Sequence, residues 1–300
     1  MNLEQLLASS TALPEKAARY AEDTYVQETV AQLDEAGIDP AEFSRRYSLL
    51  LLKPDAIVAR AVEPTLKWLQ DNEFRIVGSR ICAVDRHLVR ALWYFAWNIA
   101  SPERRRLADL LVGISDALVL VVSSESGALP TSVRLTSAKG PTAPAARRPG
   151  ELRYLLGRYS YLLNLVHSPD DPADVLREFS IYFDETTRAE LLRDIVADAE
   201  QGEQAAAYAA ELYARTPARD FDRIAAARQL ATEFGSVPVD FDPGSDEDCA
   251  ALLRRAWATG RDVDPWPAIV LGSHVLPMRS GGRRQILPPV SAHDWLEAQP

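Results

Sequence analysis

The chain has 300 residues, of which 47% are hydrophobic and 25% charged, and its formal net charge is −10. This composition is typical of a soluble globular protein, and the length allows two domains of ordinary size. The negative charge argues against general binding to nucleic-acid backbones, and no apolar run approaches the ~20 residues that a membrane-spanning helix needs.

The opening residues MNLEQLLASS lack the basic start of a secretory signal, so a cytoplasmic location is expected. The two cysteines, Cys82 and Cys249, lie far apart and have no partners at metal-ligand spacing, so no protein-bound metal site is expected. Residues 3–36 have apolar side chains at spacings of three and four, which predicts a helical extension over residues 1–44.

Four apolar runs predict β-strands, at residues 47–53, 75–84, 117–124 and 161–167. Helical patterns follow the second, third and fourth of these runs, at residues 85–99, around 128–137, and from Pro172 to about Phe183 after the N-cap residue Asp171. This order indicates an α+β domain over residues 45–183, with one sheet covered by helices.

Residues 184–300 are expected to form a mainly helical C-terminal extension. The segment 184–235 is rich in Ala and helical in pattern, and another helix is expected around 246–258. A β-hairpin is predicted in AIVLGSHVLPMRSGGRRQILPPV, residues 268–290.

The P-loop, nucleophile-elbow and HExxH motifs are all absent, so any phosphate site must use side chains. Between Thr131 and Val166 the chain carries six basic residues and one acid, Glu151, an excess of five positive charges that suits a small polyanion. His167 ends the fourth predicted strand, and Glu178 follows it by eleven residues. Taken alone, such a histidine is more often a packed or solvated residue than a nucleophile.

Several motifs add to this pattern when they are considered in chain order. The first strand ends in KPDA (residues 53–56), Trp93-Tyr94 follows, and an arginine, Arg134, stands after the third strand. Thr142 and Arg153 are eleven residues apart, and NxxH is present as residues 164–167. In these motifs and their order, about 140 residues resemble the nucleoside diphosphate kinase family.

The resemblance implies a ferredoxin-like sheet with helices, and a phosphotransferase that moves the γ-phosphate of ATP through a phosphohistidine to a nucleoside diphosphate. It implies catalytic roles for His167, Glu178 and Lys53, magnesium as the cofactor, nucleotides as partners and assembly into a homo-oligomer. The residues that it implies for nucleotide binding are Lys53, Tyr94, Arg134, Thr142, Arg153 and Asn164.

The chemistry of these side chains agrees with that role. Phosphoryl transfer depends mainly on positioning and on the dispersal of negative charge, which Lys53, Arg134 and Arg153 can supply. A neutral imidazole can accept the phosphoryl group and pass it on, and Glu178 can hold the imidazole N–H. Magnesium would be held mainly by phosphate oxygens and water. Each of these residues could instead be an ordinary surface or core residue.

The sequence also departs from the family pattern. The family continues GSD after the histidine, whereas this chain has SPD, and Pro169 cannot supply the hydroxyl of the family's serine. Arg105 and Arg106 stand where the family stacks the base on phenylalanine, and arginine could stack there or mark a changed base site. Three alternatives follow: transfer to a specialised small-molecule acceptor, a nucleotide-binding regulatory protein without turnover, and a scaffold whose residues 184–300 bind a protein partner.

Overall fold

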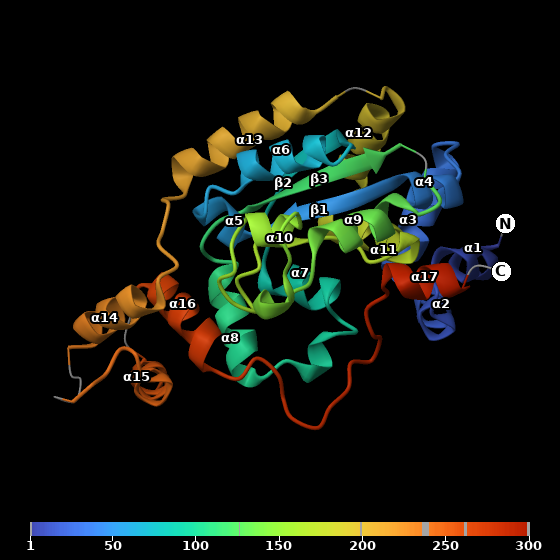
Figure 1. The fold of residues 1–300 in the computed structure, drawn as a ribbon. Helices are drawn as coiled ribbons and strands as arrows, with labels where there is room; N and C mark the ends of the chain where they lie inside the picture. The colour runs from blue at the N-terminus through green and yellow to red at the C-terminus, as the bar shows by residue number, and fades with distance from the viewer. Residues whose placement is uncertain (1, 126, 199, 236–239, 261–262, 299–300) are drawn as a thin grey trace.

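The computed structural model describes residues 2–125, 127–198, 200–235, 240–260 and 263–298. Its centre is an antiparallel sheet of four strands in the order β2-β3-β1-β4 (Figure 1). The strands are β1 (Tyr47–Leu52), β2 (Phe74–Cys82), β3 (Ala117–Ser124) and β4 (Val166–His167). The strand order and the covering helices confirm the predicted α+β, ferredoxin-like fold.

The register of the sheet brings two candidate residues together. β1 pairs with β4 through Leu51 opposite His167, and the backbone N–H of Lys53 donates to the carbonyl oxygen of Leu165 at 2.9 Å. The end of the first strand therefore lies beside the histidine, although more than a hundred residues separate them in sequence. All six residues of β1 are buried, because helices cover both faces of the sheet.

Each face of the sheet packs on its own group of helices. One face, with Leu50 and Leu120, packs on α6 (Val62–Asp71) and α13 (Gly202–Arg215). The other, with Leu49 and Val121, packs on elements of all three predicted regions, so the two extensions share a core with the sheet. These elements include α3 (Thr24–Glu35), α4 (Pro40–Arg46), α11 (Pro172–Tyr182) and α12 (Glu185–Val196).

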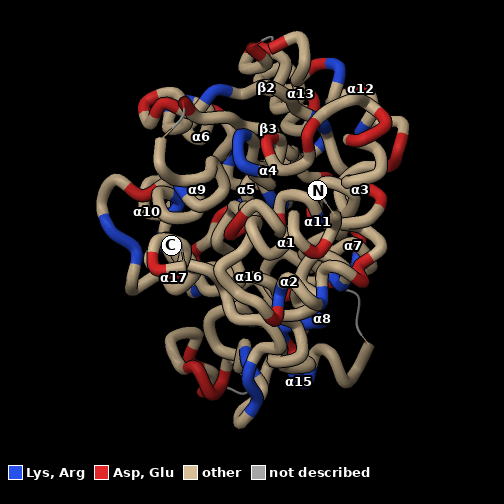
Figure 2. The backbone as a smooth tube through the Cα atoms, turned by 90° about the vertical axis from the view of Figure 1, so that its right-hand side faces the viewer, with Lys and Arg blue, Asp and Glu red and all other residues tan. Residues whose placement is uncertain are grey.

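The N-terminal region is divided more finely than the periodicity predicted. Instead of one helical stretch over residues 3–36, it forms α1 (Leu3–Ser10), α2 (Pro14–Ala21) and α3. Pro14 starts the second helix and Asp23 caps the third, so local start signals outweigh the continuous apolar pattern. Figure 2 views this side, on which acidic and basic residues are interspersed over α1, α2, α3 and α11.

Two elements of the central domain are shorter than expected. The fourth strand is limited to Val166–His167, because Leu165 adopts a positive φ of 66° and its N–H donates to Asp55 rather than to a neighbouring strand. The helix expected over residues 85–99 ends at Leu92 as α7 (Arg86–Leu92), and a short 3₁₀ turn, η1 (Trp97–Ile99), follows.

The predicted hairpin at residues 268–290 is wrong. Its first part is the helix α16 (Pro265–Val275), which Asp264 caps and which is buried on nearly all sides. α16 packs between α14 (Arg223–Phe234), α15 (Asp246–Thr259) and α8 (Pro102–Leu111). The helix expected around 246–258 corresponds to α15.

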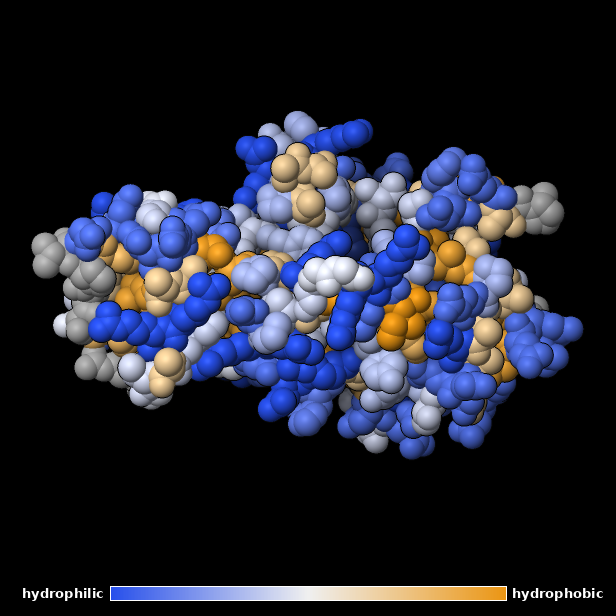
Figure 3. Space-filling model, turned by 90° about the horizontal axis from the view of Figure 1, so that it is seen from below, coloured by the Kyte–Doolittle hydropathy of each residue, from blue (hydrophilic) through white to orange (hydrophobic). Residues whose placement is uncertain are grey.

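After α16 the chain runs in an irregular course, residues 276–291, to α17 (Ala292–Ala298) (Figure 1, red). We call residues 276–291 the C-terminal strap. It lies on the face seen from below in Figure 3, where most exposed side chains are hydrophilic and apolar areas are small. In the described ranges, no helix is both long and apolar enough to cross a bilayer.

Candidate active site

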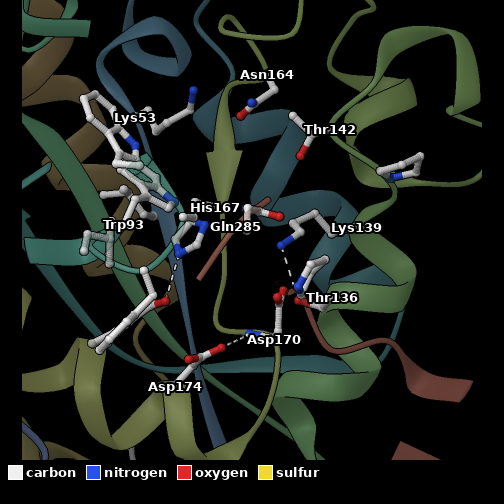
Figure 4. A pocket seen from close by; sticks show the side chains of 18 of the residues that line it. Lys53, Trp93, Thr136, Lys139, Thr142, Asn164, His167, Asp170, Asp174 and Gln285 are labelled. Carbon is white, nitrogen blue, oxygen red and sulfur yellow. Dashed lines mark hydrogen bonds and ion pairs between the residues drawn. The ribbon is translucent and has the colours of Figure 1, made fainter. Parts of the chain in front are cut away.

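A cavity of about 670 Å³ opens beside the ends of β1 and β4. Its wall includes six of the eight predicted site residues, most of which are labelled in Figure 4: Lys53, Thr142, Arg153, Asn164, His167 and Glu178. The remaining wall comes from α7, α8, α9 (Thr131–Lys139), the N-terminal helix α2 and the C-terminal strap. Both extensions therefore contribute to the same cavity as the central domain.

His167 is held by the helix that follows it. Its Nε2 lies 2.9 Å from Oε1 of Glu178, in the middle of α11, so the N–H at Nε2 donates to the carboxylate. The hydroxyl of Tyr182, one turn further along α11, donates to the other carboxylate oxygen at 3.2 Å. Because Nε2 is engaged, Nδ1 on the opposite side of the ring is the nitrogen left for chemistry (Figure 4).

Trp93 fixes the orientation of the imidazole from the side. Its ring lies edge-on to His167, with centroids 5.2 Å apart and an interplanar angle of 75°. Trp93 also stacks on Trp97, so a row of indoles extends from the histidine along the wall. Aromatic contacts of this kind restrict the rotation of the imidazole and leave its nitrogen atoms free to form hydrogen bonds.

Lys53 and Arg153 are buried cations that backbone oxygens hold in place. Lys53 Nζ donates to the carbonyl oxygen of Leu162 at 3.0 Å and lies 3.3 Å from Asp55, and burial lowers its pKa. Arg153 donates to the carbonyl oxygens of Gly140 and Val166, and burial lowers its pKa to about 10. The Nε of Arg153 is buried without an acceptor in the described part of the molecule.

Lys139 is a third buried cation on this wall, and the sequence reasoning missed it. Its side chain is almost fully buried, and its Nζ donates to Oγ of Ser168 at 2.7 Å. Burial, reinforced by the charge of Arg153, lowers its pKa to about 7. Ser168 follows His167 directly, so this ammonium group lies close to the histidine (Figure 4).

Two predicted residues do not reach the cavity. Tyr94 is 62% exposed and packs edge-on against Phe95, because α7 ends before it and Trp93 faces the histidine instead. Arg134 donates to the carbonyl oxygen of Asn72 at 2.8 Å and covers the ring of Phe74, on another side of α9. Lys139, five residues further along that helix, occupies the wall.

Thr142 and Asn164 lie on the wall and are held by neighbouring loops. Thr142 accepts a hydrogen bond from Arg153 at 3.3 Å. These two residues, eleven apart in the sequence, are therefore in direct contact. The amide nitrogen of Asn164 donates to the carbonyl oxygen of Tyr161 at 2.9 Å. The loop between them is closed by Arg147, which donates to the carbonyl oxygens of Pro141, Thr142, Gly157 and Ser160.

The hydroxyl that Pro169 cannot supply has a structural substitute. The hydroxyl of Tyr182 donates a hydrogen bond to Glu178. The hydroxyl of Ser168 is instead hydrogen-bonded to Lys139 and Thr136. The spacing of Glu178 and Tyr182, four residues apart on a predicted helix, was a signal that could have identified Tyr182.

Arg104, rather than Arg105 or Arg106, lines the cavity. Arg105 is exposed, and Arg106 lies over the indole of Trp257 in the C-terminal region, 4.5 Å from its centroid. Because the three arginines are consecutive near the start of a helix, the sequence contains no local signal that shows which of them faces the cavity.

The N-terminal extension contributes a buried charge cluster. Lys16 on α2 lies 2.9 Å from Asp171 and 2.6 Å from Asp174, and it lines the cavity with Asp174. Burial alone would lower the pKa of Lys16, but these two carboxylates raise it overall. Thr11 and Tyr20 complete the cluster through hydrogen bonds to Asp171 and Asp174.

The described residues contain no group of three or more His, Cys, Asp or Glu side chains that could hold a metal ion by themselves. Three carboxylates line the cavity, and two of them are engaged, Asp174 by Lys16 and Glu178 by His167. Asp170 is the third, and no ion pair to it occurs in the described part of the wall. This donor set fits a magnesium ion that is carried by phosphate oxygens and water, with Asp170 as the carboxylate able to contact it.

Comparison with known proteins gives a consistent result. The family model described as "Nucleoside diphosphate kinase" matches residues 46–187. The nucleoside diphosphate kinase of Roseiflexus sp. (strain RS-1) is 30% identical over 141 residues, which are 45% of this chain and 86% of that protein. That of Thermococcus kodakarensis is 28% identical over 138 residues, 45% of this chain and 75% of that protein.

Solved structures of such proteins also match. An NDP kinase from Pyrobaculum aerophilum aligns with a TM-score of 0.40 and 19% identity, covering 47% of this chain and 97% of that one. A nucleoside-diphosphate kinase from Borrelia burgdorferi, solved with vanadate and ADP, has a TM-score of 0.40 and 18% identity over 47% of this chain and 88% of that one. Residues 1–45 and 188–300 lie outside the segment that the family model matches.

Proposed function

This chain belongs to the nucleoside diphosphate kinase family, and we propose that it transfers the γ-phosphate of ATP through a phosphohistidine at His167 to a nucleoside diphosphate. The observation that carries the proposal is the 2.9 Å contact between Nε2 of His167 and Glu178, which leaves Nδ1 as the nucleophile. A carboxylate in this position keeps the proton on Nε2 and stabilises the positive charge that develops on the ring.

The reaction has two half-reactions. Nδ1 attacks the γ-phosphorus of ATP, the N–P bond forms, and the bond from that phosphorus to the bridging oxygen breaks, so ADP leaves with the electron pair. A terminal phosphate oxygen of the acceptor then attacks the same phosphorus, the N–P bond breaks, and neutral imidazole is restored. No oxidant, reductant or net proton is needed.

The charge and size of the cavity support a nucleotide. Lys53, Lys139 and Arg153 are nearly fully buried cations on one wall, and the cavity of about 670 Å³ is within the usual range for small-molecule sites. Thr142 and Asn164 add uncharged donors to the same wall. Magnesium, bound to the triphosphate, would neutralise part of its charge, and Asp170, which lines the cavity, would contact that ion.

The test is incubation with γ-labelled ATP and magnesium. Label on the protein that is stable to alkali, labile to acid and lost in His167→Ala would support the proposal. His87→Ala is the matched control, since His87 is exposed on α7 and does not line the cavity. Tight ATP binding without any label would favour the regulatory alternative.

One observation favours a second candidate, transfer to a specialised small-molecule acceptor. Gln285 and Leu287 of the C-terminal strap line the cavity, and both lie outside the segment that the family model matches. The labelled protein should therefore be offered the common nucleoside diphosphates and a panel of small metabolites. Discharge to all nucleoside diphosphates at similar rates would remove the reason for this candidate. Assembly into a homo-oligomer stays a prediction, which light scattering can check.

A further inference from the structure

A second cationic group lies on the cavity wall, formed by the central domain and the C-terminal strap together. Arg104 is on α8 and Arg279 is on the strap, and both line the cavity. Their guanidinium groups lie against the same ring, that of Tyr161, at 5.1 Å and 5.5 Å from its centroid. Arg279 also donates to the hydroxyl of Tyr161 at 3.1 Å. We call Arg104, Tyr161 and Arg279 the strap subsite.

These two arginines have no acidic partner in the part of the chain that the structure describes. A contrast is Arg90, which lies over Trp97 and forms an ion pair with Asp109 at 2.6 Å. Burial lowers the pKa of Arg104; Tyr161 opposes this shift and the charge of Arg279 adds to it. Two like charges share one ring, and an anion between them would relieve their repulsion.

Donor atoms without acceptors point in the same direction. Nε of Arg104 is buried and has no hydrogen-bond partner among the described residues, and the same is true of Nε1 of Trp97. Both side chains line the cavity, and Arg104 lies 5.8 Å from the ring of Trp97. Buried donors that are left unpaired are costly, so this corner of the cavity is suited to a ligand that supplies oxygen acceptors.

The backbone holds Arg279 in place independently of Tyr161. Arg279 forms an isolated antiparallel bridge with Ala100, and the N–H of Ser280 donates to the carbonyl oxygen of Ile99 at 2.8 Å. Further along the strap, the N–H of Ile286 donates to the carbonyl oxygen of Phe95 at 3.1 Å. These bonds lie on both sides of the loop 281–284, so backbone hydrogen bonds attach the strap to residues 95–100 at two points.

We propose that Arg104, Tyr161 and Arg279 form a second phosphate subsite, which binds a phosphate group of the substrate that is not the one transferred to His167. This proposal rests on the proposed phosphotransferase function and extends it to residues 276–291. A guanidinium pair offers several N–H donors in planar forks, which suit phosphate oxygens. The bound phosphate comes either from the donor nucleotide or from the acceptor, and the two half-reactions separate these sources.

The test compares Arg279→Gln with Arg283→Gln and Arg284→Gln in the full chain. All three arginines are on the strap and exposed, but only Arg279 lines the cavity. Calorimetry with ADP measures binding without transfer, and we expect Arg279→Gln to weaken it roughly tenfold while both controls stay within a factor of two. Arg279→Lys, which keeps the charge and loses the fork, should be intermediate.

Labelling with ATP and discharge into GDP then assign the source. An increase only in the ATP concentration for half-maximal labelling assigns the subsite to the donor, and slower discharge alone assigns it to the acceptor. If Arg279→Gln behaves like the two controls in ADP binding and in both half-reactions, the subsite is wrong. A wild-type protein that takes no label would contradict the phosphotransferase function, while ADP binding would still test the subsite.

Discussion

The phenol oxygen of Tyr182 lies 3.2 Å from Oε2 of Glu178, one helical turn along α11, while Oε1 of the same carboxylate holds His167. In the proposed mechanism, Tyr182 is therefore a positioning residue that acts through the carboxylate. Both side chains are buried, so the hydrogen bond is shielded from water.

Replacing Tyr182 with Phe removes one donor to Glu178 and should slow the labelling of His167 roughly tenfold, since a hydrogen bond to a charged group contributes about 1.5–3 kcal/mol. Single-turnover labelling at saturating ATP measures this. Tyr213→Phe is the control, because Tyr213 donates to Glu63 at 2.8 Å away from the cavity. Equal labelling rates in the two variants would remove Tyr182 from the mechanism.

Lys139 should make nucleotide binding depend on pH. Its pKa of about 7 lies below the ordinary value because of burial, so the free protein loses this charge as the pH rises above about 7. Bound phosphate favours the charged form, so binding takes up a proton and the Kd for ADP should rise between pH 7.5 and 9, by up to about tenfold per pH unit.

Lys139→Arg keeps its charge over this range and should bind ADP with a nearly constant Kd. Lys139→Met should bind more weakly at pH 7.5 and should approach the wild type at pH 9. Parallel curves for the wild type and Lys139→Arg would mean that another group causes the pH dependence.

Lys16→Met should destabilise the fold strongly. Lys16 is the cation between Asp171 and Asp174, and its removal leaves one buried and one largely buried carboxylate without a counter-charge. Loss of one partner of a buried ion pair costs about 3–5 kcal/mol in the free energy of unfolding, which urea denaturation measures.

The control for Lys16 is Arg19→Gln on the same helix. Arg19 pairs with Glu15 on the surface, and this change should cost less than about 1 kcal/mol. A Lys16→Met protein as stable as the Arg19 variant would show that the carboxylates bind protons instead of remaining charged.

Gly272→Ala should loosen the contact between α16 and α8. A Cβ atom at Gly272 would lie 2.8 Å from Cδ2 of Leu107, whose side chain is fully buried and has little room to move. Overpacking of this kind costs about 1–3 kcal/mol. Gly113→Ala meets only a carbonyl oxygen at 3.4 Å, so a comparable loss of stability there would argue against the packing explanation.

Local patterns predicted the parts of the site that lie next to strands. KPDA and NxxH stand at the ends of β1 and β4, and antiparallel pairing places them together, so Lys53 and His167 could be predicted. The proximity of Thr142 and Arg153 could also be predicted, because the two residues stand eleven apart in the sequence at the two ends of one loop.

Positions on helices were harder to predict, because one residue turns the side chain by about 100°. Arg134 and Lys139 are five residues apart, which places them about 140° apart around α9, so Lys139 lines the cavity and the predicted Arg134 does not. Trp93 and Tyr94 are adjacent, and only the end of α7 at Leu92 decides which of them faces His167.

The C-terminal contribution had no local signal at all. Arg279 meets Tyr161 across 118 residues of sequence. The hairpin expected there was wrong because α16 is a buried helix that packs on α8, far away in sequence, as well as on the preceding helices α14 and α15. Contacts of this kind arise only from tertiary packing, which periodicity does not describe.

The strap also affects when the cavity becomes complete during synthesis. The ribosome makes the chain from its N-terminus, so the strands of the sheet, His167 and the lysines emerge before residues 276–291. Until then the wall lacks Arg279, Gln285 and Leu287. If the strap binds phosphate as proposed, a nascent chain would hold nucleotide less firmly than the finished protein, and the proposed transfer would reach its full rate only after translation has passed the strap.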